Sequence, residues 1–301
     1  MPPMRAEYRE EPCRAALNRV TGMDFQWSLN PYIGCAHRCT FCYVRGFERR
    51  AERPWDEHYG ASIRAKTNVA AVLREELARP SWRREGVVVG AATDPYQPAE
   101  GRYRLTRACI EALVGARNPF DLITRSPLVV RDIDVLQEAS RRAAVSINLS
   151  VPTLDERVWQ TTEPGTPPPR QRLRALTMLV NAGIRAGVAM APILPGLSDR
   201  PDSLRDVVRA SREAGACFLW ASPVNLRPGT REYFLEALAR DWPEQVALVE
   251  RRFAHGSYPN REDVAPMSEA VRALKRSEGI ADRRSVRLEP PPEPEQLALA
   301  V

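Results

Sequence analysis

Three cysteines within eight residues, Cys35, Cys39 and Cys42, are the side chains of this chain with the most distinctive chemistry. Their spacing is C-x-x-x-C-x-x-C, and the aromatic Phe41 stands directly before the last one. Three thiolates this close can hold three irons of a [4Fe–4S] cube and leave the fourth iron open to an exchangeable ligand, whereas an electron-transfer cluster normally takes four cysteines. The motif therefore predicts a cluster that binds a molecule and reacts with it.

Two other uses of these cysteines compete with the open cluster. A structural zinc site usually takes four ligands, often as two separated pairs, and His37 inside the loop could be the fourth. A disulfide is expected in exported proteins, and the first twenty residues hold no apolar run of signal-peptide length. The spacing favours the cluster, with zinc as the alternative. The remaining cysteines, Cys13, Cys109 and Cys217, are scattered, so we interpret them as structural or incidental.

The cysteine motif with its aromatic resembles that of the radical S-adenosylmethionine (SAM) enzymes. The preceding string, SLNPYIGC over residues 28–35, resembles the narrower branch that contains spore photoproduct lyase. This resemblance implies a partial (β/α)6 barrel and two cofactors, a [4Fe–4S] cluster and SAM. It also implies an external electron donor of flavodoxin or ferredoxin type. The implied activity is reductive cleavage of SAM to methionine and a 5′-deoxyadenosyl radical, which removes a hydrogen atom from the substrate.

Composition indicates an ordinary soluble protein. Hydrophobic residues make up 44% of the chain and charged residues 27%. No stretch approaches the about 18 apolar residues that a membrane span needs, so we expect a cytoplasmic protein without a membrane partner. The formal net charge is +6, and the basic residues are almost all arginine, with Lys66 and Lys275 as the only lysines. That bias reflects genome composition more readily than phosphate binding, and a nucleic-acid partner stays open. The sequence does not determine the oligomeric state.

Short apolar runs alternate with helical patterns through most of the chain. The predicted strands are residues 86–92, 120–124, 145–150, 184–191 and 217–221, with another strand before Cys35. The predicted helices between them are residues 68–77, 106–114, 133–144, 170–181 and 203–214. Strand and helix in regular alternation indicate a parallel sheet with right-handed crossovers, and about six such units predict an open partial barrel, independently of the resemblance.

We predict three regions along the chain. Residues 1–24 form a polar N-terminal arm, and residues 25–228 form the barrel domain. Residues 229–301 form a helical C-terminal extension that ends in a proline-rich, disordered tail. Within the extension, the predicted helices are residues 233–239, 246–253 and 267–276.

Ligands of βα barrels bind at the carboxyl ends of the strands, so polar residues there are candidate cofactor contacts. Thr93 and Asp94 follow the second strand, where the resemblance implies a contact to the SAM ammonium. Arg125 follows the third strand, where it implies a contact to the SAM carboxylate, for which arginine is well suited. Asn148 and Ser150 share one face of the fourth strand, and a polar pair inside a buried strand needs partners. Capping or surface roles are the alternatives.

Two aromatic residues flank the last cysteine of the motif. Phe41 is predicted to pack near the adenine of SAM, with plain core packing as an equal alternative. Tyr43 stands where spore photoproduct lyase has a tyrosine implicated in hydrogen transfer, which makes it the candidate catalytic residue, with packing under the loop as the alternative.

The resemblance weakens at one point. The lyase has a hydrogen-donating cysteine soon after its second strand. Residues 90–97 contain none here, and Cys109 on the following helix is no substitute. The sequence thus predicts a radical SAM enzyme with an unidentified substrate. DNA-lesion repair or modification is the first alternative, and a non-enzymatic iron–sulfur or zinc protein is the second.

Overall fold

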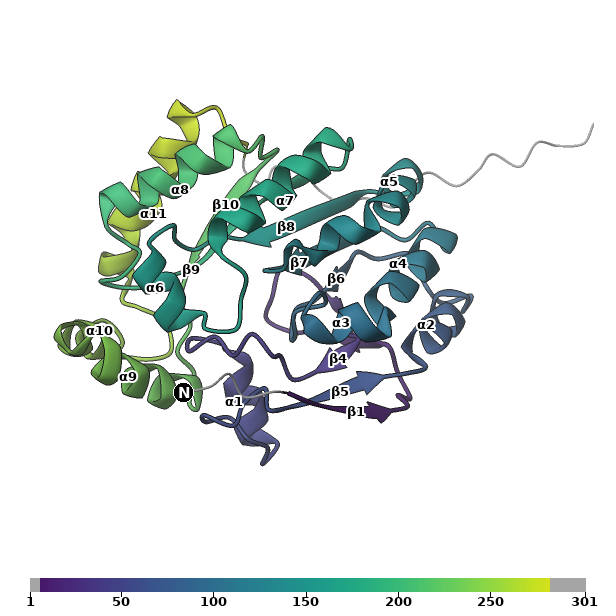
Figure 1. Ribbon diagram of the computed structural model, residues 1–301, viewed down its shortest axis with the longest axis horizontal. Coiled ribbons are helices and arrows are strands. Elements are labelled where there is room, and N and C mark those ends of the chain that lie inside the picture. Colours follow the sequence, from purple (N-terminus) through teal and green to yellow (C-terminus); the bar gives the residue numbers. More distant parts are fainter. Residues whose placement is uncertain (1–5, 282–301) are drawn as a thin grey trace, which may run out of the picture.

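Six parallel strands form the centre of the protein, as seen in a computed structural model that describes residues 6–281. In spatial order they are β3 (Trp27–Leu29), β6 (Val87–Val89), β7 (Phe120–Thr124), β8 (Val145–Ser150), β9 (Ala186–Ile193) and β10 (Leu219–Pro223). The strand β2 (Leu17–Arg19) pairs antiparallel with β3 at the edge. The sheet curves into an open barrel with helices on its outer side (Figure 1). The predicted partial (β/α)6 barrel is confirmed.

The central strands are buried because both faces of the sheet are covered. All residues of β6 and β8 are buried, and so are most residues of β7 and β9. The strand β6 is a continuous apolar run, as is typical of a parallel sheet covered on both faces, whereas β8 alternates apolar residues with the buried polar residues Ser146, Asn148 and Ser150. This burial explains why the sequence alone located these strands.

The helices that cover the barrel coincide closely with the predicted ones. They are α2 (Val69–Leu77), α4 (Leu105–Gly115), α5 (Ile133–Arg142), α7 (Pro169–Asn181) and α8 (Pro201–Glu213). Shorter elements that the sequence did not predict are α1 (Val44–Arg50), α3 (Pro98–Tyr103), α6 (Glu156–Thr162) and the 3-10 helices η1 (Pro127–Asp132) and η2 (Pro243–Gln245). One or two turns of helix give too few residues for a periodic pattern.

A small second sheet ties the N-terminal residues to the barrel. The strand β1 (Glu7–Glu11) pairs parallel with β5 (Ser62–Lys66), and β4 (Tyr32–Ile33) pairs antiparallel with the other side of β5. Most side chains of β1 are exposed, and strand pairing uses the backbone, so a polar strand at an edge leaves no apolar signal in the sequence. This pairing is a finding that the polar composition of residues 1–24 did not predict.

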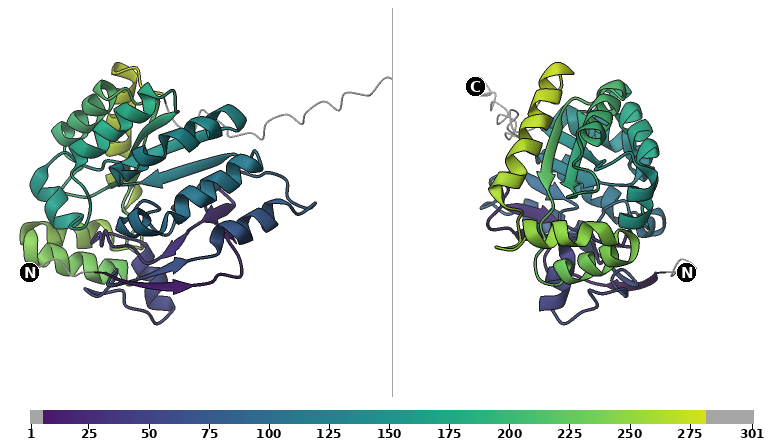
Figure 2. Two further views of the ribbon diagram at one scale, coloured as in Figure 1. Left: turned by 45° about the vertical axis from the view of Figure 1, so that its right-hand side comes forward. Right: turned by 90° about the vertical axis from the view of Figure 1, so that its left-hand side faces the viewer.

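The C-terminal helices are α9 (Thr230–Asp241), α10 (Val246–Arg252) and α11 (Arg261–Ser277), each overlapping a predicted helix. The helix α9 contacts α1 of the cysteine segment, while α11 packs against α8 and β10 (Figure 2). The proline-rich segment of the predicted tail lies outside the described residues. No helix among residues 6–281 is both long and apolar enough to cross a membrane.

Candidate active site

A cavity of about 350 Å³ opens at the carboxyl ends of the barrel strands. Residues from the end of every parallel strand line it, beginning with the cysteine loop after β3 and closing with the segment after β10. This is the position where βα barrels bind their ligands, because the loops that follow the strands converge there. The lining side chains that the sequence singled out are Cys35, Cys39, Phe41, Cys42, Tyr43, Thr93, Asp94, Arg125 and Ser150.

The three cysteines of the motif meet at one cavity. Cys35, Cys39 and Cys42 all line it, and no other cysteine among the described residues does. Three thiolates with no fourth cysteine are the donor set that holds three irons of a [4Fe–4S] cluster and leaves the fourth iron open. The residues present therefore fit the three protein-bound corners of such a cluster.

Burial makes two of these thiols weak acids until a metal binds. It raises the pKa of Cys35 well above its ordinary value and raises that of Cys39 to about 12. Metal binding would therefore release protons, as it does at other thiolate sites.

A buried arginine, Arg45, supports the loop from behind. Its guanidinium donates hydrogen bonds to the carbonyl oxygens of Trp55 at 2.5 Å and Asp56 at 2.6 Å, and its Nε donates to that of Cys39 at 3.3 Å. It also lies 3.7 Å from the ring centre of Tyr233 on α9. Arg45 thus joins the cysteine loop, the segment after α1 and the C-terminal extension, and it places a positive charge near the thiolates.

The carboxylate of Asp94 is engaged by its own chain. It accepts hydrogen bonds from Thr124 Oγ1 at 2.6 Å, Arg125 N at 2.7 Å and Tyr96 N at 2.9 Å. His37 Nδ1 lies 3.2 Å from its second oxygen, so the histidine inside the motif faces Asp94. Burial by itself would raise the pKa of Asp94, but His37 and the hydrogen bonds outweigh it and hold this pKa at about 2. The group is therefore ionised at neutral pH.

The neighbouring residue Thr93 and the buried Gln97 fix the backbone at the start of the motif. Gln97 Oε1 accepts from Ala36 N at 3.0 Å, and its Nε2 donates to Gly34 O at 3.1 Å and to Thr93 Oγ1 at 2.9 Å. The Thr93 hydroxyl in turn donates to Gly34 O at 2.6 Å. Reasoning from sequence recognised the polar loop but not the role of Gln97, because two of its three partners are backbone atoms of the distant residues Gly34 and Ala36, which no sequence pattern indicates.

Arg125 belongs to a buried group of three charges. Its Nε donates to Glu163 Oε1 at 2.6 Å, while Arg172 Nη1 donates to Glu163 Oε2 at 3.0 Å. The Arg125 guanidinium carbon also lies 5.6 Å from the ring centre of Phe41. Two cations and one anion leave a net positive charge beside Cys39. Sequence reasoning missed Glu163 and Arg172, which lie far from Arg125 along the chain and match no motif.

The structure separates the polar pair predicted on β8. Ser150 lines the cavity, but Asn148 lies deeper and is not among the lining residues. Asn148 Nδ2 donates to Leu122 O at 3.2 Å, and its Oδ1 accepts from Trp220 Nε1 at 2.8 Å. Both side chains point to the same face of the sheet, as the period of two predicts. They differ in depth within the barrel, and only Ser150, which is nearer the carboxyl end of the strand, lines the cavity.

Tyr43 also lines the cavity, and its hydroxyl donates to the carbonyl of Ala91 beyond β6. Its ring stacks edge-on against Phe47, with ring centres 5.7 Å apart. Burial raises the pKa of Tyr43 above its ordinary value. The phenol is therefore neutral, held in one orientation and exposed to the cavity, which is compatible with hydrogen transfer or with support of the loop.

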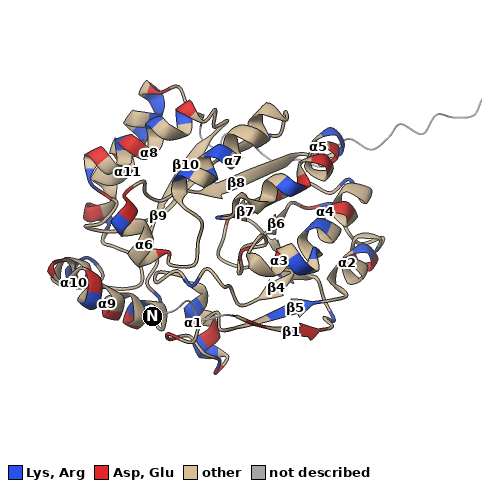
Figure 3. Cartoon of the chain, viewed as in Figure 1, with Lys and Arg blue, Asp and Glu red and all other residues tan. Residues whose placement is uncertain are grey.

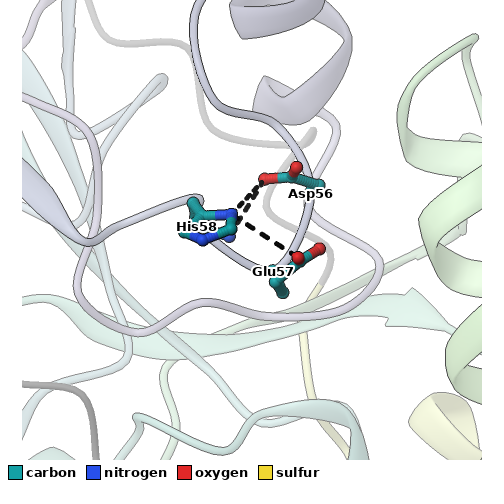
Figure 4. A group of neighbouring side chains, drawn as sticks. All are labelled: Asp56, Glu57 and His58. Carbon is teal, nitrogen blue, oxygen red and sulfur yellow. Dashed lines mark hydrogen bonds and ion pairs between the residues drawn. The ribbon is translucent and has the colours of Figure 1, made fainter.

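One further cluster of metal-ligating side chains lies outside the cavity. Asp56, Glu57 and His58 are consecutive on the segment after α1 (Figure 4). His58 Nδ1 is 3.3 Å from Asp56 Oδ1 and 3.5 Å from Glu57 Oε1. Glu57 and His58 are exposed and Asp56 is partly buried, and among the described residues the ion pairs of these side chains stay within the trio, so we assign no function to them.

Comparisons with known proteins show the family and the fold. The family model described as the radical SAM superfamily matches residues 29–208. An uncharacterized protein of Mycobacterium tuberculosis strain H37Rv is 37% identical over 270 residues, which cover 86% of this chain and 79% of that protein. An uncharacterized protein of Methanocaldococcus jannaschii is 23% identical over 77% of this chain and 83% of its own.

Among solved structures, spore photoproduct lyase complexed with dinucleoside spore photoproduct superposes with a TM-score of 0.66. The sequence identity is 14%, and the match covers 90% of this chain and 79% of the lyase. At this identity the likeness establishes the fold and no more. Together with the family match, it shows that the chain belongs to the radical SAM superfamily, whose enzymes use a [4Fe–4S] cluster and SAM, and that it has the partial-barrel fold of the lyase.

Proposed function

We propose that this enzyme binds a [4Fe–4S] cluster through Cys35, Cys39 and Cys42 and uses it to cleave SAM reductively. The observation that carries the proposal is that three cysteines, and no fourth among the described residues, line the cavity at the carboxyl ends of the barrel strands. When bound, the two cofactors supply a 5′-deoxyadenosyl radical that removes a hydrogen atom from the substrate, at the expense of one electron from an external donor of flavodoxin or ferredoxin type.

The chain's own residues would bind and orient SAM. The Arg125 guanidinium lines the cavity and is suited to the SAM carboxylate, and Glu163 fixes its orientation. Asp94 is ionised at neutral pH and would attract the SAM ammonium, with Thr93 beside it. Phe41, buried under Arg125, would border the adenosine. Tyr43, at the wall of the cavity, would take part in hydrogen transfer.

Anaerobic reconstitution with iron and sulfide tests the proposal. After addition of SAM and dithionite, we expect 5′-deoxyadenosine from the wild-type enzyme and only background from Cys39→Ala, because that variant lacks one cluster ligand. The matched control is Cys217→Ala, since Cys217 is exposed and does not line the cavity. Iron, sulfide and zinc contents and SAM binding by calorimetry are measured on the same samples. Zinc without iron, or a cluster that does not bind SAM, would contradict the proposal.

A nucleic-acid substrate is the second candidate. The superposed lyase holds a dinucleoside lesion, and this chain carries a net charge of +6. Photoproduct repair of the lyase type is not proposed, because residues 90–97 lack the donor cysteine. Basic and acidic residues occur on the same helices in the cartoon of Figure 3, so the net charge by itself does not mark a binding face. Support for such a substrate must come from the cavity itself.

A further inference from the structure

The segment that follows β10 presents two polar side chains to the cavity. Val224 and Leu226 are buried in the hydrophobic core that the C-terminal helices share with the cysteine loop. Asn225 and Arg227 alternate with them and both line the cavity. A hydrogen bond of 2.7 Å from Leu226 N to Ser257 O holds the segment in place. The alternation follows from extended backbone, and it places the amide and the guanidinium side by side.

The Asn225 amide has no hydrogen-bond partner among the residues that the structure describes. Both its Oδ1 and its Nδ2 are buried, and neither makes a hydrogen bond to any residue within the described range 6–281. Unpaired buried polar atoms cost free energy and are rare in folded proteins, so each such group calls for an explanation. A primary amide offers an acceptor and a donor in one plane. Its complement is a planar group with a donor beside an acceptor, which is the hydrogen-bonding edge of a nucleobase.

Arg227 is the second unengaged group. The Arg227 guanidinium forms no ion pair with an acidic side chain within residues 6–281. By contrast, Arg49 of α1 pairs with Glu232 of α9 at 2.6 Å. Its guanidinium lies 5.9 Å from the ring centre of Phe47. Two residues of extended chain separate it from Asn225 by about 7 Å. A guanidinium at this position suits an anion, phosphate above all, attached to the group that binds the amide.

Apolar and aromatic side chains line the rest of this part of the cavity. Within residues 6–281 three large hydrophobic side chains are exposed, and two of them, Met23 at 48% and Tyr258 at 59%, line the cavity. Phe25 and Trp220 line it as well. Exposed apolar side chains gathered at a cavity indicate a ligand surface, and aromatic rings are the usual platform on which bases stack.

We propose that this rim, formed by Met23, Phe25, Trp220, Asn225, Arg227 and Tyr258, binds a nucleotide unit of the substrate. The base packs against the apolar side chains and pairs with the Asn225 amide, while the phosphate binds Arg227. The proposal rests on the proposed function, which places SAM beside the cysteines. SAM also offers a base and an anionic carboxylate, but the proposed function assigns that carboxylate to Arg125. A second occupant that engages both Asn225 and Arg227 beside bound SAM is therefore a nucleotide, either free or within a strand.

Calorimetry on the reconstituted, SAM-saturated enzyme tests this assignment. The probes are the four deoxynucleoside 5′-monophosphates, the matching nucleosides and a short single-stranded DNA of mixed sequence. We expect Asn225→Leu to weaken binding of the preferred base about tenfold, whether or not the phosphate is present. Arg227→Gln should weaken the monophosphate about tenfold and leave the nucleoside unchanged. The matched control is Asn181→Leu, because Asn181 is exposed at the end of α7, remote from the strand ends.

Two further readouts make the test decisive. Asn225→Leu should raise the midpoint of thermal unfolding without ligand, since it removes a buried unpaired amide; a lowered midpoint would reveal an internal partner and overturn the proposal. SAM affinity should not change in Asn225→Leu; if it falls while nucleotide affinity holds, the amide binds adenine and the proposal is wrong.

Failure to bind any of the probes would also overturn the proposal. Tight binding of DNA with weak binding of monophosphates identifies the strand as the source of the nucleotide, and the reverse identifies free nucleotides. If the wild-type enzyme neither binds SAM nor forms 5′-deoxyadenosine, the proposed function fails, and this outcome is distinguishable from a failure of the nucleotide proposal alone.

Discussion

The two sides of the cavity differ in how their polar groups are satisfied. On the cysteine side, Asp94, Gln97 and Glu163 each bind several partners within the chain. On the rim after β10, the Asn225 amide is buried without a partner and the Arg227 guanidinium has no ion pair among the residues that the structure describes. Apart from His37 Nδ1, which is also buried without a hydrogen bond among the described residues, the polar groups of the cysteine side are thus paired within the chain, whereas the rim keeps groups that we propose are paired by a ligand.

This contrast has a physical reason. A reactive cofactor requires groups held in fixed positions, because reorganisation during the reaction would raise its barrier. Hydrogen bonds within the chain provide that rigidity and also stabilise the fold. A group reserved for a substrate must stay unpaired and therefore lowers stability until the substrate binds. Substitutions on the two sides should accordingly have effects of opposite sign on unfolding.

The largest expected effect is that of Glu163→Gln. It leaves the buried Arg172 and the largely buried Arg125 without their anion, so the free energy of unfolding should fall by about 3–5 kcal/mol. Urea unfolding of the purified protein measures it. Glu138→Gln is the control, because Glu138 makes the same kind of pair with Arg141 and Arg142 on the surface of α5 and should matter little. Equal effects of the two substitutions would contradict the distinction.

An intermediate effect is expected for Gln97→Ala. The substitution removes hydrogen bonds to Gly34, Ala36 and Thr93, so the free energy of unfolding should fall by about 2 kcal/mol. The start of the cysteine loop would also lose its fixed position, and iron content after reconstitution should drop. Gln160→Ala on α6 is the control, since Gln160 is exposed and donates only to Glu156. Full iron content in Gln97→Ala would show that the loop holds its shape without this side chain.

The smallest expected effect is that of Asp134→Asn, away from the cavity. A hydrogen bond from Arg107 lowers the pKa of Asp134 to about 2, against about 3.9 in an unfolded chain. A depressed pKa stabilises the fold above pH about 4, and that contribution disappears as the pH falls toward 2. Because the side chain is exposed, the difference from wild type should be slight at pH 7, shrink with added salt and vanish near pH 2. Thermal midpoints at pH 7 and pH 3 check it; a difference that grows on acidification would refute the assignment.

The sequence predicted the elements that are long or rich in apolar residues. Residues 120–124 and 145–150 coincide with β7 and β8, because short segments rich in apolar and β-branched residues, set between helical patterns, indicate strands even where buried polar residues interrupt them. It did not predict α1, α3 or the pairing of β1 with β5. Those elements are short or polar and depend on backbone contacts with segments distant in the chain, which leave no local pattern.

At the site, the sequence by itself determined the chemistry and its approximate place. The spacing of Cys35, Cys39 and Cys42 specifies the kind of centre that these thiols can form, and strand-end positions placed Asp94 and Arg125 near it. Only the tertiary structure decided which polar groups are engaged and which remain open. Glu163 binds Arg125 and Arg172, while the Asn225 amide has no hydrogen-bond partner in the described part of the chain, because a hydrogen bond depends on the distance and direction of atoms that folding brings together.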